Sequence, residues 1–567
     1  MSVITRPLSW IGLYRDDEKA RISADAEKSL NETFTNEPLT DFTLKDEAER
    51  LKAAFDDLRH RCGKAHEVTI GGQIATGEGV IESHDPSCRS RLLARFPRLT
   101  KIEAGRAVET AHNAFDSWKS VPPADRALCL EKAAIELRRQ KSELTALICT
   151  EVGKPWREAD ADVAEAIDFC RYYARQYLKM TNTPWRGDVP GETNKLLPDP
   201  RGVVAVIGPW NFPLAIPLGM TAAALVTGNT AVVKPAEQST WIAHRFVQIL
   251  HNCGVPRDAV ILAPGDAEAG AALVDHRHTS MIVFTGSREV GVHINKVATT
   301  QAPGQRFVKK VAAEMGGKNA IIIDDDANLD DAVLGVLHSA FGYSGQKCSA
   351  CSRVIVLESI YTTFVERLKQ AAESLVIGPA QDPATQVGPL VDAESVRRFW
   401  RYAEMARRDG QIIAEVPVPP HLRETGHFVP VLVVGGVPPT HPLAQEEIFA
   451  PILTVLPAKS FKEAINLAND VDYALTGAVY SRDPGHLRQA SDEFLAGNLY
   501  LNRGSTGAMV GRQPFGGMKM SGIGAKTGGP HYLDQFVNFR TITENTMRRG
   551  FTPESVAAHE AEESPPA

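Results

Sequence analysis

Cys348 lies in a segment whose residue types suit a nucleophile. The segment runs Tyr343-Ser-Gly-Gln-Lys-Cys348-Ser-Ala-Cys351, with small residues on both sides of the thiol and Lys347 beside it. Small neighbours leave a thiol approachable, and an adjacent cation favours the thiolate, which is the form that attacks. A single cysteine is more often buried packing than a nucleophile, so this segment needs partners elsewhere in the chain.

The spacing of Cys348 and Cys351 is also that of a redox or zinc motif. A zinc site would need a second pair at usable spacing, and the remaining cysteines stand singly. A helix follows the cysteines of a thioredoxin-like motif, whereas a strand is expected here at Arg353–Leu357. We therefore predict no metal at this pair. For Cys351 two interpretations stay open, simple packing or a disulfide with Cys348 under oxidation.

Two further polar residues stand where they could assist a nucleophile. Glu314 precedes Met315-Gly-Gly-Lys-Asn319 and an apolar strand, and a glutamate beside a flexible turn suits a general base. Asn211, in Gly208-Pro-Trp-Asn-Phe-Pro213, follows a predicted parallel strand, where ligands of open α/β sheets bind. Its amide could donate to an oxyanion. Taken singly, a surface turn glutamate and a turn asparagine are the ordinary interpretations.

A glycine-containing turn could hold a phosphate. Gly286-Ser-Arg-Glu-Val-Gly291 follows an apolar strand and opens a predicted helix. Glycines and a helix N-terminus suit a phosphate group. The pattern is not G-x-G-x-x-G, so the standard Rossmann fingerprint is missing and the isolated match is weak.

These residues must be positioned by alternating strands and helices. Apolar runs of strand length recur at Val203–Ile207, Ala231–Val233, Val260–Leu262, Met281–Phe284 and Ala320–Ile323. Helical patterns such as Trp241–Cys253 and Ala267–His276 separate them. The alternation predicts βαβ units and a parallel sheet, and the near-continuous apolar strands predict a sheet covered on both faces.

Other elements frame this sheet. A second α/β domain is expected to follow it, with a helix at Asp331–Phe341 and strands near Val354–Leu357, Ile452–Val455 and Ala478–Tyr480. Upstream, the periodicity predicts helices at Asp46–Arg61, Ala104–Ser120, Ala124–Glu151 and Glu158–Lys179. Residues 1–65 are expected to form a polar arm with one helix, and the polar tail 551–567 is expected to be disordered.

Composition limits the class of protein. The chain has 567 residues, 43% hydrophobic and 23% charged, with a net charge of -7, which suits a globular protein of two or three domains. No basic excess points to nucleic acid, and no apolar run approaches the roughly 20 residues that cross a bilayer. Eight irregularly spaced cysteines indicate reduced thiols. We expect a small-molecule enzyme in the cytoplasm, or in the mitochondrial matrix of a eukaryote, without nucleic-acid or membrane partners.

Placed in chain order, these segments resemble the signatures of the aldehyde dehydrogenase superfamily. The resemblance runs from about Val68 to about Thr546 and rests on Pro209-Trp-Asn-Phe-Pro213, Lys234-Pro-Ala-Glu237, Phe284-Thr-Gly-Ser287, Glu314-Met-Gly-Gly317, Gly345-Gln-Lys-Cys348, Glu446-Glu-Ile-Phe449 and Pro514-Phe-Gly-Gly517. It implies an aldehyde dehydrogenase-like α/β fold with a Rossmann-type cofactor domain, an α/β catalytic domain and a small β oligomerisation element. The implied boundaries are 66–314 for the NAD-binding domain, interrupted by an oligomerisation hairpin at 183–201, then 315–505 for the catalytic domain and 506–550 for an anchor loop and oligomerisation strand.

The same resemblance implies oxidation of an aldehyde through a covalent thioester. Cys348 would be the nucleophile, Glu314 the base, and Asn211 with the Cys348 backbone N–H the oxyanion hole. NAD is implied rather than NADP, because a carboxylate at Glu237 favours ribose hydroxyls over a 2′-phosphate. The implied cofactor-binding residues are Ile207, Pro209, Trp210, Lys234, Glu237, Gly286, Ser287, Val290, Gly316, Glu447 and Phe449.

Three segments further resemble the glutamate semialdehyde (1-pyrroline-5-carboxylate) dehydrogenase subgroup, which acts second in proline catabolism. They are Gly345–Arg353, Ala161–Phe169, and Ser505–Gln513 with Lys526–Pro530. The implied substrate contacts are backbone N–H groups of Gly507 and Ala508 and the Ser349 hydroxyl for the carboxylate, Glu165 for the ammonium, and Phe212 and Phe515 around the aliphatic chain. Some members carry serine at Ala508, which removes one hydroxyl but keeps the backbone donor. An exposed helix glutamate and core packing of the phenylalanines are the competing interpretations.

Alternatives and partners follow from the same segments. Another semialdehyde dehydrogenase, such as one for succinate semialdehyde, is the nearest alternative function. A catalytically silent binding protein of this fold is a second one, disfavoured by intact Cys348, Glu314 and Asn211. Thr183–Arg201 and Gln535–Glu544 resemble segments that pair with a partner subunit, so a homo-oligomer, a dimer or larger, is expected. Because the resemblance starts near Val68, we expect one activity and no upstream proline dehydrogenase domain.

Overall fold

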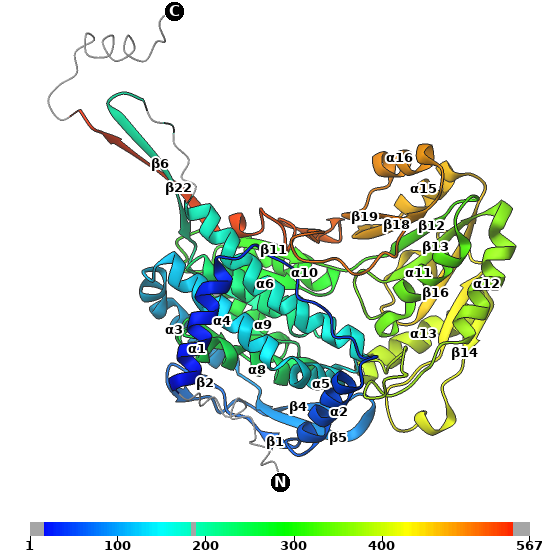
Figure 1. Ribbon diagram of the computed structural model, residues 1–567, viewed down its shortest axis with the longest axis horizontal. Coiled ribbons are helices and arrows are strands. Elements are labelled where there is room, and N and C mark those ends of the chain that lie inside the picture. Colours follow the sequence, from blue (N-terminus) through cyan, green and yellow to red (C-terminus); the bar gives the residue numbers. More distant parts are fainter. Residues whose placement is uncertain (1–15, 183–186, 188, 548–567) are drawn as a thin grey trace, which may run out of the picture.

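The structure, a computed structural model, describes residues 16–182, 187 and 189–547. Two large sheets covered by helices form the body, and a long two-stranded arm projects from it (Figure 1). Within those residues, no helix combines the length and apolar character needed to cross a bilayer. The tail 551–567, predicted from its sequence to be disordered, lies outside the described residues.

Two helices, where the sequence predicts one, precede the first strands. The additional helix is α1 (Asp16–Leu30), whose sequence is largely polar and which buries Ala26 completely. The predicted helix is α2 (Lys45–Arg59), which buries apolar side chains such as Phe55. Short strands follow: a sheet in the order β1 (Lys64–Ala65), β5 (Cys88–Pro97), β4 (Val80–Asp85), and a hairpin of β2 (Thr69–Ile70) and β3 (Gln73–Ile74).

The helix predicted at Ala124–Glu151 is wrong as a single element. The chain instead forms α4 (Pro123–Arg139) and α5 (Lys141–Val152), because Gln140 departs from helical geometry at φ -96° and ψ 14°. Its side chain is buried and accepts a hydrogen bond from Arg245 Nη2 at 2.7 Å, which holds the bend. The other two predicted helices are present, as α3 (Lys101–Lys119) and α6 (Trp156–Asn182).

The first large sheet has the order β21-β11-β10-β7-β8-β9, parallel except for β21. Its strands are β7 (Val203–Ile207), β8 (Thr230–Lys234), β9 (Val260–Leu262), β10 (Thr279–Thr285), β11 (Lys310–Glu314) and β21 (Gly522–Ile523). The sequence pattern missed β11 because its apolar run is only Val311–Ala313. From β7 the successive strands β8 and β9 are added toward one edge of the sheet, and from β10 the next strand, β11, is added toward the other edge. The switch point therefore lies between β7 and β10, and ligands of such sheets bind at this point.

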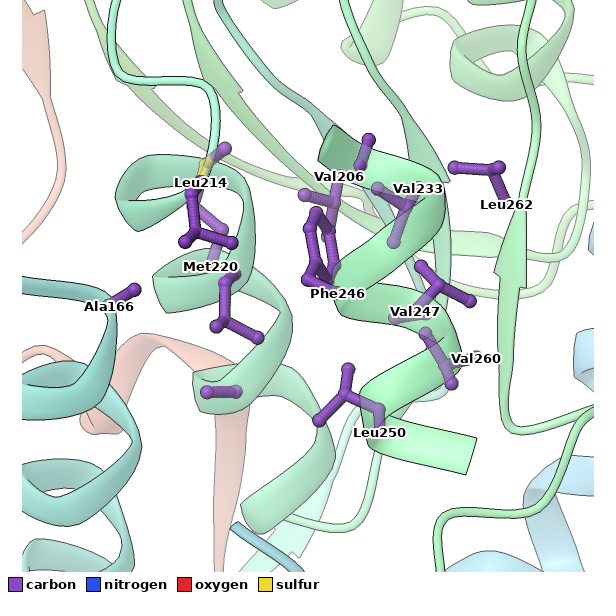
Figure 2. Close-up of a cluster of buried hydrophobic side chains, with 14 of the residues drawn as sticks. Ala166, Val206, Leu214, Met220, Val233, Phe246, Val247, Leu250, Val260 and Leu262 are labelled. Carbon is purple, nitrogen blue, oxygen red and sulfur yellow. The ribbon is translucent and has the colours of Figure 1, made fainter. Parts of the chain in front are cut away.

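Helices cover this sheet on both faces, as its apolar strands predict. They are α7 (Ala215–Val226), α8 (Thr240–Asn252), α9 (Ala267–Asp275) and α10 (Arg288–Ala298). Figure 2 shows Val206 and Val233 of the sheet beside Phe246 of α8, with Met220 of α7 on the other side of the cluster. These side chains are at most 4% exposed. Burial of each such side chain is worth about 1.5–3 kcal/mol.

The second large sheet has the order β14-β15-β16-β13-β12-β18-β19, parallel except for β14. Its strands are β12 (Asn319–Ile323), β13 (Cys351–Leu357), β14 (Gln411–Val416), β15 (Val431–Gly435), β16 (Ile452–Ala458), β18 (Thr476–Tyr480) and β19 (Asn498–Leu501). Its helices are α11 (Leu329–Phe341), α12 (Tyr361–Glu373), α13 (Ala393–Asp409), α14 (Pro442–Gln445), α15 (Phe461–Asn469) and α16 (Pro484–Glu493). A small ladder of β17 (Tyr473–Ala474) and β20 (Met518–Lys519) lies beside it. The strand after Cys351 is present as β13, which removes the thioredoxin-like interpretation.

The connection between the sheets determines where a site can form. β11 ends at Glu314 and β12 begins at Asn319, so four residues lead from the carboxyl edge of the first sheet to the amino edge of the second. Loops at both edges therefore face each other. The arm is separate from this junction: β6 (Glu192–Pro200) pairs antiparallel with β22 (Val537–Asn545) along its whole length (Figure 1).

Candidate active site

Asn211 lies in the loop after β7, at the switch point of the first sheet. It is buried, and its Nδ2 donates a hydrogen bond to the carbonyl oxygen of Gln346 at 3.1 Å. Gln346 stands two residues before Cys348, so this bond joins the Asn211 loop to the segment of the candidate nucleophile. An amide NH2 has two N–H groups, so a second donor is left for a ligand oxygen.

The Cys348 segment begins with an unusual turn after α11. Tyr343 and Ser344 have positive φ values of 52° and 58°, which are costly for residues other than glycine. Contacts outside the turn hold them: Tyr343 Oη donates to Val152 O at 2.8 Å, and Ser344 Oγ donates to Gly388 O at 2.8 Å. This turn directs the following residues into the junction between the sheets.

The backbone of Cys348 is fixed by the strand that follows Glu314. Asn319 Nδ2 donates to the carbonyl oxygen of Cys348 at 2.7 Å. A Cβ atom added at Gly317 would lie 2.7 Å from that same oxygen, so only glycine permits this approach. The Cys348 segment and the Glu314-Met-Gly-Gly turn, separate in sequence, are therefore packed backbone to backbone.

The expectation that Lys347 would favour a Cys348 thiolate is wrong for this structure. Lys347 Nζ pairs with Glu158 Oε1 on α6 at 2.7 Å, so its charge is already compensated. Burial raises the pKa of the Cys348 thiol to about 12, and the charges of Glu314 and Glu447 raise it in the same direction. The thiol is the resting form here, and a base must take its proton when it attacks.

Glu314 is suited by its surroundings to accept a proton near neutral pH. Burial raises the pKa of its carboxyl group to about 8, against the opposing charge of Lys526. Its Oε2 atom is buried without a hydrogen-bond partner among the described residues, and Oε1 lies against Gly516. A buried carboxylate with an open acceptor beside a thiol is the arrangement that general-base catalysis needs.

The adenosine-end candidates lie along the carboxyl edge of the first sheet. Ile207 and Lys234 are neighbours in the β7–β8 register, and Pro209 follows in the β7 loop. Burial lowers the pKa of Lys234, and the charge of Glu237 acts against this shift. Glu237 itself is exposed at the start of a short 3₁₀ turn (Glu237–Ser239), where its carboxylate is available to ribose hydroxyls.

The candidate phosphate turn is at the N-terminus of α10. Ser287 caps this helix, its side chain accepting a hydrogen bond from Val290 N at 3.4 Å. The apolar side chain of Val290 is 47% exposed in the first turn. Gly286 N donates to the carbonyl oxygen of Glu314 at 3.1 Å, which ties this turn to the base candidate. An exposed valine beside a helix N-terminus fits an adenine ring and a pyrophosphate.

The nicotinamide-end candidates surround the glycine turn after Glu314. Glu447 Oε1 accepts a hydrogen bond from Gly317 N at 3.0 Å, and a Cβ atom added at Gly316 would lie 2.0 Å from Glu447 Oε2. Burial raises the pKa of Glu447 to about 7, so donated ribose hydroxyls would favour its charged form. The rings of Trp210 and Phe449 meet edge to face, 5.5 Å apart. Two carboxylates, an ammonium and a helix N-terminus along the two facing edges fit a dinucleotide.

The substrate-end candidates come from three separate parts of the chain. Glu165 is partly buried on α6, and burial with the charge of Asp162 raises its pKa to about 8. Ser349 O accepts a hydrogen bond from Ser505 Oγ at 3.2 Å, which places the chain leading to Gly507 and Ala508 beside the nucleophile segment. The backbone at Gly507 has a φ of 80°, which glycine tolerates best.

The two candidate phenylalanines come from segments that are far apart in the sequence. Phe212 follows Asn211, and Phe515 is held by a backbone pairing with Thr527, with hydrogen bonds of 2.9 and 2.8 Å. No ring contact joins them to each other in the part of the chain that the structure describes. Their position on either side of a substrate chain therefore stays a prediction.

Comparison with known proteins identifies the family. The sequence model of the aldehyde dehydrogenase family matches residues 74–542. This chain belongs to the aldehyde dehydrogenase family. The 1-pyrroline-5-carboxylate dehydrogenase of Geobacillus kaustophilus is 43% identical over 512 residues, 90% of this chain and 99% of that protein. The 1-pyrroline-5-carboxylate dehydrogenase 2 of Bacillus subtilis is 40% identical over the same share of this chain.

Solved structures agree with the fold. A 1-pyrroline-5-carboxylate dehydrogenase from Thermus with bound NAD has a TM-score of 0.87 and 42% identity, covering 91% of this chain and 99% of that one. Proline utilization A from Bdellovibrio bacteriovorus has a TM-score of 0.89 and 45% identity, covering 92% of this chain. The aldehyde dehydrogenase chain described here spans only 54% of that longer protein.

Sequence reasoning missed several residues that support this site. Lys154, Asp162 and Asn319 are buried, and each contacts the loop or segment of a candidate catalytic residue. Asp162 lies within a segment that resembles the subgroup, but nothing in that segment distinguishes a supporting acid from a substrate-binding one. Lys154 follows a glycine at the end of a helix, and its sequence context predicts only a surface turn.

Proposed function

We propose that this aldehyde dehydrogenase oxidises L-glutamate γ-semialdehyde, the open form of 1-pyrroline-5-carboxylate, to L-glutamate with NAD, as the second step of proline catabolism. The observation that carries the proposal is the full-length similarity to relatives named 1-pyrroline-5-carboxylate dehydrogenase. The proposed cofactor domain is 66–314 and the proposed catalytic domain 315–505, with the arm and anchor loop around them. Free cysteines fit a reducing compartment, and we place the reaction in the cytoplasm.

The first half of the reaction forms a thioester on Cys348. Its Sγ attacks the aldehyde carbon, a C–S bond forms, and the carbonyl oxygen becomes an alkoxide as the thiol proton passes to a water molecule, which leaves Glu314 ionised for the second half. Asn211 Nδ2 and the Cys348 backbone N–H donate to the alkoxide, and removal of one such donor costs about 2.7–4 kcal/mol in comparable sites. When bound, NAD supplies the acceptor for the hydride that leaves the former aldehyde carbon.

The second half releases the acid. Glu314 takes a proton from a water molecule whose oxygen attacks the thioester carbon, and the C–S bond breaks. The carboxylate product leaves, and Cys348 regains its proton. Glu314 must be ionised for this step, and its raised pKa keeps it a strong enough base to act near pH 8.

Residues along the two facing edges hold the cofactor in this proposal. Lys234 and Glu237 bind the adenosine ribose, Gly286 and Ser287 approach the pyrophosphate, and Glu447 binds the nicotinamide ribose. The contributing neighbours are Ile207, Pro209, Trp210, Val290, Gly316 and Phe449. A carboxylate at Glu237 disfavours a 2′-phosphate, so NAD is the expected partner rather than NADP.

The far end of the substrate carries a carboxylate and an ammonium group. Backbone N–H groups at Gly507 and Ala508, with the Ser349 hydroxyl, are proposed to hold the carboxylate. Glu165 is proposed to pair with the ammonium. The aliphatic chain lies between Phe212 and Phe515.

Replacing Glu165 with glutamine is expected to raise KM for glutamate semialdehyde about 10- to 100-fold, the range for a lost charge-assisted hydrogen bond. The kcat value should change little, because the ammonium lies far from the reacting carbon. Steady-state NADH formation measures both constants. Succinate semialdehyde, which lacks the ammonium, is the control substrate, and its KM should not rise. An equal rise for both substrates would contradict the role of Glu165.

The substrate proposal itself is tested by following NADH with purified protein, NAD and either 1-pyrroline-5-carboxylate or succinate semialdehyde. A higher kcat/KM for 1-pyrroline-5-carboxylate is expected. Preference for succinate semialdehyde would keep the aldehyde dehydrogenase chemistry and overturn the assigned substrate.

We also propose that the β6–β22 arm pairs with a second copy of the chain, giving a dimer or larger assembly. The arm extends from the body and exposes Phe539 (49%) and Ile542 (36%). Exposed strands with apolar side chains favour pairing with another chain. Light scattering during size-exclusion chromatography should give at least twice the monomer mass. A double replacement of Phe539 and Ile542 by glutamate should lower that mass; an unchanged mass would place the interface elsewhere.

A further inference from the structure

A lysine is completely buried beneath the Asn211 loop. Lys154 stands between α5 and α6, and its side chain and that of Asp162 are both 0% exposed. The preceding Gly153 has a φ of 71°, and a Cβ atom there would lie 2.7 Å from Pro389. The backbone is therefore held tightly at this turn, and Lys154 is directed into the protein.

All three directions of the Lys154 ammonium group are occupied. Its Nζ atom lies 2.9 Å from Asp162 Oδ2 and 2.9 Å from the carbonyl oxygen of Asn211. It also lies 3.6 Å from the centre of the Phe212 ring. An ammonium has three N–H donors, and here they meet a carboxylate, a carbonyl and an aromatic face. A buried charge is tolerated only with such complete compensation.

Asp162 extends the same contact to the other end of the loop. Its Oδ1 atom accepts a hydrogen bond from Ala215 N at 2.7 Å. The pair thus holds the loop at the carbonyl of Asn211, the ring of Phe212 and the N–H of Ala215. The side chain of Asn211 is left to reach the Cys348 segment through Gln346.

We propose that Lys154, paired with Asp162, is a positioning residue that aligns the Asn211 amide with the oxyanion formed on Cys348. An oxyanion donor acts only within about 2.7–3.1 Å of the developing charge. A displacement of about 1 Å at such a group costs about 10²-fold in rate. The three contacts from one buried pair hold the Asn211 loop against that displacement.

The Lys154–Asp162 pair also influences the ionisation of Glu165, and the meaning of this effect for substrate binding rests on the proposed function. Glu165 lies one turn after Asp162 on α6, so the negative charge of Asp162 opposes ionisation of Glu165. The Lys154 charge counteracts this effect. One lysine therefore supports the oxyanion donor and the group proposed to pair with the substrate ammonium.

The test is a double-mutant cycle between Lys154→Met and Asn211→Ala, assayed with a simple aldehyde such as propanal. Propanal carries neither carboxylate nor ammonium, so the result does not depend on the substrate assignment. Lys154→Met is expected to lower kcat about 10²-fold in the wild-type background. In the Asn211→Ala background it should lower kcat by less than about 3-fold, because the group it positions is gone. If Lys154→Met only reduced the amount of folded protein, it would lower kcat by the same factor in both backgrounds.

Two comparisons complete the experiment. Lys141→Met is the matched control, because Lys141 also forms an ion pair with α6. Its Nζ atom lies 3.1 Å from Asp160 Oδ1, and the two side chains are 13% and 3% exposed, respectively. Lys141→Met should leave kcat within about 3-fold of wild type. If Lys154→Met does not fold, Lys154→Gln, which keeps an N–H donor, enters the same cycle. Multiplicative effects of the Lys154 and Asn211 changes, or an equal loss in Lys141→Met, would overturn the proposal.

Discussion

Cys348→Ala is expected to lower kcat for aldehyde oxidation by at least about 10⁴-fold, as the loss of a covalent nucleophile does in other enzymes. The alkoxide and the thioester both form on this sulfur in the proposed mechanism. Steady-state NADH formation measures the loss. Binding of NAD, followed by its effect on protein fluorescence, should remain because the adenosine-end residues are untouched.

Cys351→Ala is the matched control for this experiment. Cys351 is 2% exposed, and its thiol donates a hydrogen bond to Arg353 O at 3.3 Å. It should retain most of the activity. Equal loss in both variants, or full activity in Cys348→Ala, would remove Cys348 from the mechanism. Protection from mild peroxide in Cys351→Ala alone would instead support an oxidative disulfide between the two cysteines.

Alkylation of Cys348 gives a pH dependence with a defined sign. Burial and two nearby carboxylates raise its pKa to about 12. Below that value the thiolate fraction grows tenfold for each pH unit. Labelling by iodoacetamide without cofactor should therefore accelerate steadily from pH 7 to 10. A plateau near pH 7 would show that the thiol is already ionised in the resting enzyme.

Glu314→Gln is the second large effect expected, a loss of about 10²- to 10⁴-fold in kcat. Glutamine has nearly the same shape but cannot accept a proton from water, so the thioester should form and then persist. Rapid mixing should show a first turnover of NADH followed by a very slow steady rate. Mass spectrometry of the stalled enzyme should find the acyl group on Cys348.

The pH profile of the wild-type enzyme follows from the same residue. The pKa of Glu314 is raised to about 8 by burial, and a general base acts in its deprotonated form. The kcat value should therefore rise with pH and level off above about 8, and this rise should disappear in Glu314→Gln. A variant with neither a first turnover nor steady activity would show that Glu314 is needed for attack on the aldehyde rather than for hydrolysis alone.

Much of the fold could be predicted because its signals are local. The strands β7 and β9 are uninterrupted apolar runs, and their bounds match the predicted ranges. Helix α1, the bend at Gln140 and strand β11 could not be predicted in this way. Their stability comes from contacts such as Arg245 with Gln140, which are 105 residues apart in the chain.

The sequence by itself determined the chemistry available to this protein. Cys348, Glu314 and Asn211 stand in short motifs whose glycines and small residues are needed where they occur, as the approach of Gly317 to Cys348 O illustrates. Only the tertiary structure decided the electrostatics and the support of that site. Lys347, next to Cys348 in sequence, is paired with Glu158, 189 residues away, and Lys154 reaches Asn211 across 57 residues. Charge and alignment depend on which groups meet after folding, and burial then sets the proton affinity of each.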